Sequence, residues 1–110
     1  MQITTREMKR AVVMTVSGRV DSASAPDMEK TLQTLIDQNH HYIVAELTGV
    51  EYMSSAGLRA LVSGLKGAKR GGGDLVIAQP SERVREVLDL AGLTSVFTVY
   101  GDTVEAVGSF

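Results

Sequence analysis

Apolar runs typical of strands alternate with helical apolar stripes along most of this chain. Two strands are predicted at the start, at 3–8 and 11–16, with a hairpin turn at Lys9 and Arg10. The elements expected after them are a helix at 25–38, a strand at 42–47, a helix that ends at the glycines 71–73, a strand at 74–78, a helix that ends at Gly92, a strand at 95–100 and a terminal helix up to Val107. Strands separated by helices need right-handed crossovers. The predicted fold class is therefore α/β, with a mixed, mostly parallel sheet of four to five strands, about four helices and the first strand antiparallel at an edge.

Residues with capping chemistry precede the predicted helices. Ser24, Ser81 and Asp102 suit N-caps, Ser24 and Asp27 have the spacing of a capping pair, and Gly92 suits a helix stop. The residues expected to face a core are Met28, Leu32, Leu35 and Ile36 in the first helix, Leu58, Leu61, Val62 and Leu65 in the second, and Val84, Val87, Leu88 and Ala91 in the third.

Length and composition limit the classes of protein to consider. A chain of 110 residues with 44% hydrophobic content suits one domain, residues 1–110. A net charge of −2 gives no general attraction to nucleic acid. The absence of cysteine excludes disulfides and thiolate metal sites, the first ten residues lack the apolar core of a signal peptide, and no apolar run is long enough to span a bilayer. We therefore expect a cytoplasmic protein without a metal or other cofactor and without direct contact with nucleic acid or membrane.

The stretch 50–65, VEYMSSAGLRALVSGL, places a small polar patch at the start of a helix. Free backbone N–H groups and a partial positive charge at a helix N-terminus allow a hydroxyl there to cap the helix or to carry a phosphate, and Ser54 and Ser55 can divide these tasks. Gly57 costs roughly 1 kcal/mol in a helix, which suggests that a strand or another protein approaches the backbone closely. Since a buried strand is predicted at 42–47, the serines should lie at the carboxyl edge of the sheet, where α/β folds bind ligands.

A second candidate position lies in the turn after the second strand. Asp21 should face the same edge of the sheet, where it serves either as a turn cap or as a contact for a partner, and Ser22 adds a hydroxyl there. Next to the serines, Arg59 should be exposed, whereas Met53 and Leu58 are expected in the core.

Several enzymatic and metal-binding readings are not supported by the residues. The chain has no G-x-S-x-G elbow, and His40 and His41 are adjacent without an orienting partner, as in a solvated linker. The glycine-rich run 67–73 closes a helix, whereas a phosphate-binding loop opens one. We therefore predict no catalytic residue and no enzyme, and we expect Lys66, Lys69 and Arg70 to form a solvated basic face.

The chain resembles the STAS domain family, most closely the anti-sigma factor antagonists of sporulation and stress response. The resemblance is carried by the two-strand start, the G-x-x-D turn at 18–21, the strand end ELTGV and the motif YMSSAGL. It implies that the helices lie mainly on one face of the sheet, that a partner kinase phosphorylates Ser55, and that Asp21 contacts that kinase. Many members have aspartate where this chain has Ser54, which removes one negative charge from the surface.

The resemblance also implies a function and its partners. Unphosphorylated, the protein would bind an anti-sigma factor with serine kinase activity and free the sigma factor, and a serine phosphatase would reverse the modification. The alternative is an adaptor subunit of a lipid-transport complex or stress-sensing particle, without sigma control. The oligomeric state stays open. The residues predicted to contact a partner are Asp21, Ser22, Ser54, Ala56, Gly57 and Arg59.

Overall fold

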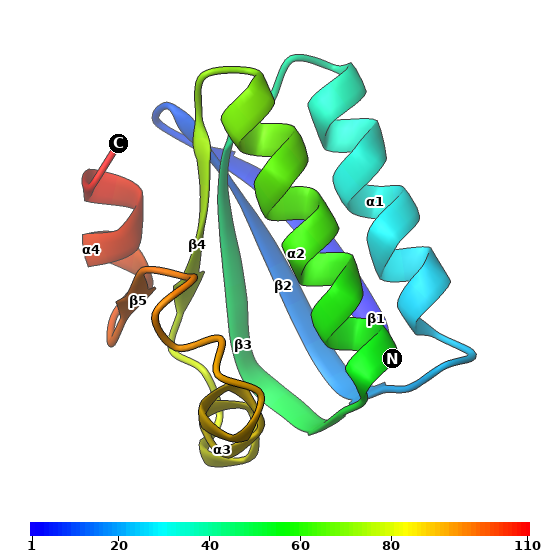
Figure 1. Cartoon of the computed structure of the whole chain (residues 1–110). Helices are drawn as coiled ribbons and strands as arrows, with labels where there is room; N and C mark the ends of the chain where they lie inside the picture. The colour runs from blue at the N-terminus through cyan, green and yellow to red at the C-terminus, as the bar shows by residue number, and fades with distance from the viewer.

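A five-stranded mixed sheet forms the centre of the computed structural model, which describes residues 1–110 (Figure 1). The strands are β1 (Gln2–Met8), β2 (Ala11–Val20), β3 (Tyr42–Met53), β4 (Asp74–Ala78) and β5 (Val99–Tyr100), and they lie in the sheet in that order. β1 pairs with β2 in antiparallel fashion at one edge, and the other pairs are parallel. The predicted hairpin and the mostly parallel sheet are thus confirmed.

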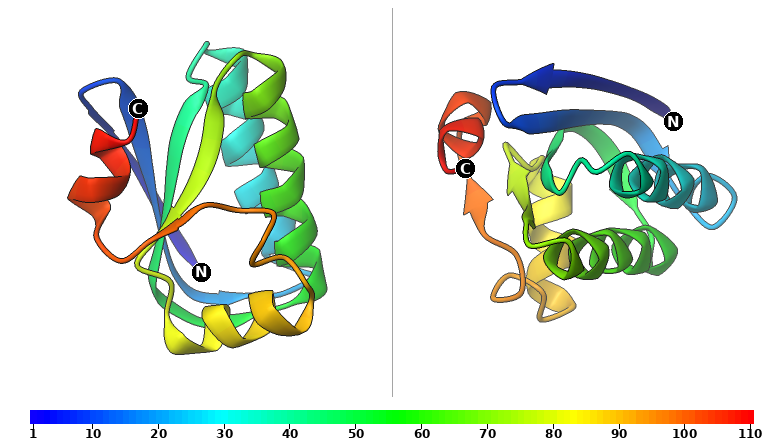
Figure 2. Two further views of the ribbon diagram at one scale, coloured as in Figure 1. Left: turned by 60° about the vertical axis from the view of Figure 1, so that its left-hand side comes forward. Right: turned by 90° about the horizontal axis from the view of Figure 1, so that it is seen from above.

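Three helices cover one face and end of the sheet, and one small helix covers the other face. α1 (Ala25–Asp37) and α2 (Ser55–Arg70) lie side by side on one face, and α3 (Glu82–Leu90) packs near the end of β3 (Figure 2). These three helices and the sheet enclose a cluster of 23 buried residues. On the opposite face, α4 (Thr103–Gly108) and the sheet together form a smaller cluster of seven buried residues. Most of the core therefore lies on one side, as the family resemblance implied.

Two glycines of α2 allow α1 to approach closely. A Cβ atom at Gly64 would lie 2.8 Å from Leu32 Cδ1, and one at Gly67 would lie 2.6 Å from Ile36 Cδ1. Such distances are shorter than real Cβ contacts, so a larger residue at either position would have to displace the end of the Leu32 or Ile36 side chain. The cost of glycine inside a helix is offset here by close helix packing.

Two strands are longer than predicted and one is shorter. β2 and β3 continue past the predicted ends at 16 and 47, through polar and glycine residues that pair from Ser17 with Gly49 to Val20 with Met53. Hydrogen bonds between the two strands keep these residues in the sheet, although their sequence lacks the apolar pattern of a strand. The pairing is interrupted by two register shifts. The predicted strand at 95–100 forms only at its last two residues, because the turn before it buries Phe97 in the core.

Most of the predicted caps form. Ser81 accepts a hydrogen bond from the N–H of Val84 at 3.2 Å, Asp102 accepts one from Val104, and Gly92 ends α3 with φ +71°. The predicted capping pair at Ser24 is wrong, because the Ser24 side chain makes no cap hydrogen bond to α1 and bonds to Asp21 instead.

The two histidines are not simply solvated. Both are half-buried, and His40 Nε2 lies 3.4 Å from a carboxylate oxygen of Glu7. His41 packs against Gly71 and Gly73, and a Cβ atom at Gly73 would lie 1.8 Å from the carbonyl oxygen of His41. The glycine run therefore makes room for His41 as well as ending α2. No group of three histidine, aspartate or glutamate side chains is arranged to hold a metal ion, and none of the helices is long and apolar enough to cross a bilayer.

Candidate functional site

The carboxyl ends of β2 and β3 meet at one rim of the sheet, where the two predicted site segments come together. Val20 pairs with Met53, and the backbone N–H of Ser54 donates a hydrogen bond to the carbonyl of Val20 at 2.8 Å. The turn that starts at Asp21 and the first turn of α2 therefore begin at adjacent points (Figure 1). We call residues 21–24 and 54–59 the rim.

The two adjacent serines have different environments. Ser54 is half-buried with extended backbone angles, and its Oγ accepts a hydrogen bond from the N–H of Gly57 at 3.3 Å. Ser55 is the first residue of α2, is exposed, and its hydroxyl makes no hydrogen bond within the chain. Ser54 therefore caps the helix, and Ser55 carries the hydroxyl that another molecule can reach.

The N-terminus of α2 carries the positive end of the helix dipole, and its first turn holds no acidic side chain. Its first intrahelical bond runs from the N–H of Leu58 to the carbonyl of Ser54 at 3.1 Å, so the N–H groups of Ser55 and Ala56 precede that bond and have no partner in the helix. The first turn of α2 contains no acidic residue. The other three helices each have one there, namely Asp27 in α1, Glu82 in α3 and Glu105 in α4. An anion at Ser55 would thus meet a favourable field.

The close approach that Gly57 requires is made by the sheet. A Cβ atom there would lie 2.3 Å from Met53 Sδ and 2.8 Å from Val20 Cγ1. Gly57 is buried and presents little surface to a partner. Met53 and Leu58 lie in the core and Arg59 is exposed, as predicted, while Ala56 is half-exposed.

Asp21 organises the turn that leads into α1. Its Oδ1 accepts hydrogen bonds from the N–H of Ala23 at 3.1 Å and from the N–H and the hydroxyl of Ser24, both at 3.0 Å. These bonds, above all the one from the Ser24 N–H, lower the pKa of the Asp21 carboxyl. Oδ2 accepts no hydrogen bond in the chain, and the neighbouring Ser22 is exposed. The turn-cap role is confirmed, and one carboxylate oxygen remains free at the rim.

The sequence pattern did not identify a further exposed pair beside the rim. The guanidinium of Arg19 lies over the ring of Tyr52, 4.4 Å from its centroid, where the two strands pair. This geometry is a cation–π contact. The sequence pattern does not reveal this contact, because the predicted strands end at residues 16 and 47 and so do not include Arg19 and Tyr52 as paired residues.

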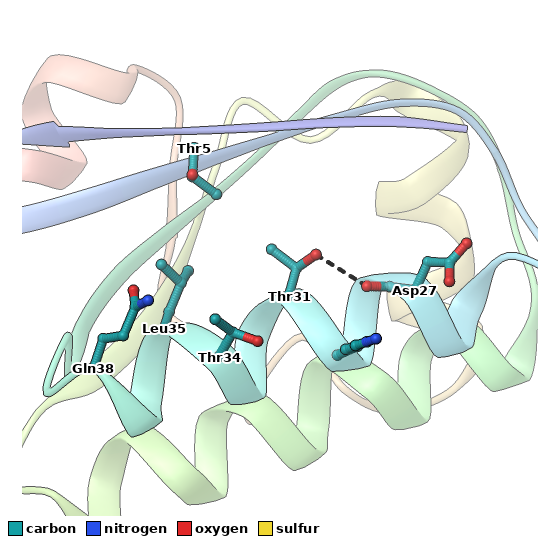
Figure 3. Close-up of a pocket in the computed structure, with 7 residues that line it drawn as sticks. Thr5, Asp27, Thr31, Thr34, Leu35 and Gln38 are labelled. Atoms are coloured by element: carbon teal, nitrogen blue, oxygen red, sulfur yellow. Dashed lines mark hydrogen bonds between the residues drawn. The ribbon is translucent and has the colours of Figure 1, made fainter.

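The largest hollows do not coincide with the rim. One, of about 500 Å³, lies between α1 and the edge strand β1 and has a single apolar lining residue, Leu35 (Figure 3). In it the Thr31 hydroxyl donates a hydrogen bond to the Asp27 carbonyl at 3.0 Å. The lining contains one carboxylate, that of Asp27, and one amine, that of Lys30, together with three threonines and Gln38. This set forms no recognisable catalytic group.

The fold and rim together define a small α/β domain that presents a free serine hydroxyl at a helix N-terminus. The model of the STAS domain family matches residues 2–106, so the chain belongs to that family. It is 30% identical over 110 residues to BtrV of Bordetella bronchiseptica, which bears the name of an anti-sigma factor antagonist, covering 100% of this chain and 95% of BtrV. It is 29% identical over 94 residues to the anti-sigma-B factor antagonist of Bacillus subtilis, covering 86% and 85% of the two chains.

Solved structures agree on the fold. The anti-sigma factor antagonist SpoIIAA of Bacillus superimposes in its unphosphorylated form with a TM-score of 0.83 at 20% identity, covering 96% of this chain and 93% of that one. Its phosphorylated form gives a TM-score of 0.78 at 18% identity and covers 98% of both chains. At these identities the match establishes the fold alone.

Proposed function

We propose that this STAS domain is an anti-sigma factor antagonist and that phosphorylation of Ser55 switches its binding off. The main support for Ser55 as the phosphorylation site is the contrast between the two serines. Ser54 is engaged as the N-cap, while the Ser55 hydroxyl is exposed and free. The names of its relatives support the function.

The partner would be an anti-sigma factor with serine kinase activity. The unphosphorylated domain binds it through the rim and thereby frees the sigma factor, and a serine phosphatase restores the binding form. Around Ser55, the exposed residues Ser22 and Arg59 and the free oxygen of Asp21 are the proposed contacts. In this proposal the protein is a cytoplasmic regulator and the substrate of a kinase, not an enzyme.

The physical basis of the switch is the cost of burying a phosphate in the complex. A phosphate on Ser55 adds about −1.5 to −2 charges near pH 7. The N-terminus of α2, whose first turn holds no acidic residue, tolerates that charge in the free domain. A partner that closes over Ser55 would have to desolvate an unpaired anion, which costs several kcal/mol, and every 1.4 kcal/mol lowers affinity about tenfold.

The test is phosphorylation by the purified anti-sigma factor with ATP, followed by peptide mass spectrometry on the wild type, Ser54→Ala and Ser55→Ala. We expect phosphate on Ser55 in the wild type and in Ser54→Ala, and none in Ser55→Ala. Phosphate on Ser54 alone would contradict the site.

Calorimetric binding to the same anti-sigma factor tests the mechanism. Ser55→Ala should bind with or without ATP, and the phosphorylated wild type should bind at least about 100-fold more weakly. Undiminished affinity of the phosphorylated protein would overturn the switch. If the domain were never phosphorylated in the presence of ATP and bound equally with and without ATP, the result would favour the adaptor function.

A further inference from the structure

The exposed face of α2 combines an unpaired basic stripe with an apolar groove. Arg59, Lys66, Lys69 and Arg70 are four of the eleven basic residues of the chain, and α2 contains none of its thirteen acidic residues. The one ion pair in the chain joins His40 and Glu7, so none of these four cations is paired.

Stabilisation of the helix does not account for the whole stripe. Lys69 and Arg70 lie in the last turn, where cations complement the negative end of the helix dipole. Arg59 lies near the positive end and Lys66 before the last turn, and the dipole effect falls off within one turn. Arg59 and Lys66 are therefore available for an external anionic group.

The groove lies between α2 and the segment that follows α3, which passes beside α2 (Figure 2). It has a volume of about 420 Å³ and an apolar floor made by Leu58, Val62 and Leu93. Arg59, Ser63 and Lys66 complete its lining. A second hollow, lined by Lys66, Lys69 and Arg70, continues the basic surface along the helix.

We propose that this groove binds an acidic amphipathic helix of another protein. Seven residues of helix separate Arg59 from Lys66, which is roughly 10.5 Å. A helix laid alongside would present carboxylates at i and i+7 to these two cations, while its apolar stripe faces the floor of the groove. Charge complementarity of this kind favours association with an acidic partner.

A nucleic acid fits this surface less well. Outside α2 the chain has seven basic against thirteen acidic residues, so a polyanion longer than the groove would meet repulsion. Bases of single strands stack on aromatic side chains, and the exposed tyrosines, Tyr42 and Tyr52, lie on β3 and do not line the groove. The apolar floor instead suits aliphatic side chains.

The test uses three labelled peptides of about 18 residues, each long enough for five helical turns. The first is an acidic helix with leucines at i, i+3, i+4 and i+7 and glutamates on its flanks. The second has the same composition in an order without an apolar stripe, and the third replaces each glutamate with lysine. Fluorescence anisotropy gives affinities, and amide chemical shifts map the site on the unphosphorylated protein.

We expect the first peptide to bind at least about tenfold more tightly than the other two, a difference of about 1.4 kcal/mol. Shifts should concentrate at Leu58 to Lys66 and at Leu93. Lys66→Glu and Arg59→Glu should each weaken binding about tenfold, while the matched control Lys30→Glu on α1, which changes the net charge equally, should change it less than about twofold.

Other results would overturn the proposal. These are equal binding of the reordered peptide, no binding at about 1 mM, shifts that map elsewhere, or tighter binding of single-stranded DNA or of anionic vesicles that Lys66→Glu abolishes. The peptides involve neither kinase nor sigma factor, so this proposal and the phosphorylation switch can fail independently.

Discussion

Replacing Ser54 and Ser55 separately by alanine should give opposite results for stability and for phosphorylation. Ser54→Ala removes the oxygen that accepts the hydrogen bond from the N–H of Gly57. Loss of a serine N-cap costs about 0.5 to 2 kcal/mol, and because this bond is long, 3.3 Å, we expect about 1 kcal/mol. For a domain of this size that corresponds to a decrease in Tm of about 4 °C.

Ser55→Ala removes a hydroxyl that makes no hydrogen bond within the chain. Since alanine is the best helix former and the position is exposed, the free energy of unfolding should change by less than about 0.5 kcal/mol, and any change should be stabilising. The two variants differ by one position and delete the same atom, so each is the control for the other.

Urea unfolding followed by circular dichroism measures both free energies under identical conditions. Ser54→Ala should unfold at lower urea with an unchanged m-value. The reasoning would be refuted if Ser55→Ala were the destabilised variant, or if the two lost the same stability. Either result would mean that Ser55, and not Ser54 alone, holds the start of α2.

Three further predictions concern stability. Leu61 is fully buried, so Leu61→Ala should lower the free energy of unfolding by about 2 to 5 kcal/mol. Leu90 is exposed, so Leu90→Ala should change it by less than about 0.5 kcal/mol in the same urea titration. Gly73→Ala would place a Cβ 1.8 Å from a backbone oxygen and should cost about 1 to 3 kcal/mol by thermal unfolding, while Gly101→Ala, with open space around it, should be nearly neutral. Since the pKa of Asp21 is lowered in the folded state, its contribution is present above its unfolded pKa of about 3.9 and is lost as the pH falls through the folded value. Asp21→Asn should lack this acid-dependent loss, and an identical pH profile of variant and wild type would contradict it.

Local chemistry made the helix ends predictable from the sequence. Ser81 and Asp102 cap their helices because their side chains reach N–H groups two or three residues further on, a distance within the sequence window. Ser24 fails as a cap because its hydroxyl has a second local partner, Asp21, which competes for it. The sequence contains both options, and their relative energies depend on the path of the turn after β2.

Features that depend on pairing between distant segments were not predictable in the same way. The extensions of β2 and β3 contain polar and glycine residues such as Ser17 and Gly49, which stay in the ladder because they pair with each other across the two strands. The sequence alone is compatible with either a strand or a partner close to Gly57, and only the positions of Val20 and Met53 decide for the sheet. The division between Ser54 and Ser55 likewise requires the helix start to be fixed to one residue.

A negative charge at Ser55 should leave the isolated domain intact, so any loss of binding arises in the complex. Ser55→Asp places a carboxylate at the N-terminus of α2, whose first turn has no acidic residue. Such a charge typically contributes about 0.3 to 1 kcal/mol of stability at low salt. Urea unfolding should therefore show equal or greater stability, with a gain that shrinks as salt is added. Ser95→Asp, the same exchange at an exposed turn away from any helix start, should show no gain. If Ser55→Asp instead destabilised the domain, a negative charge at Ser55 would not be compatible with the folded domain. Phosphorylation would then have to act by unfolding α2.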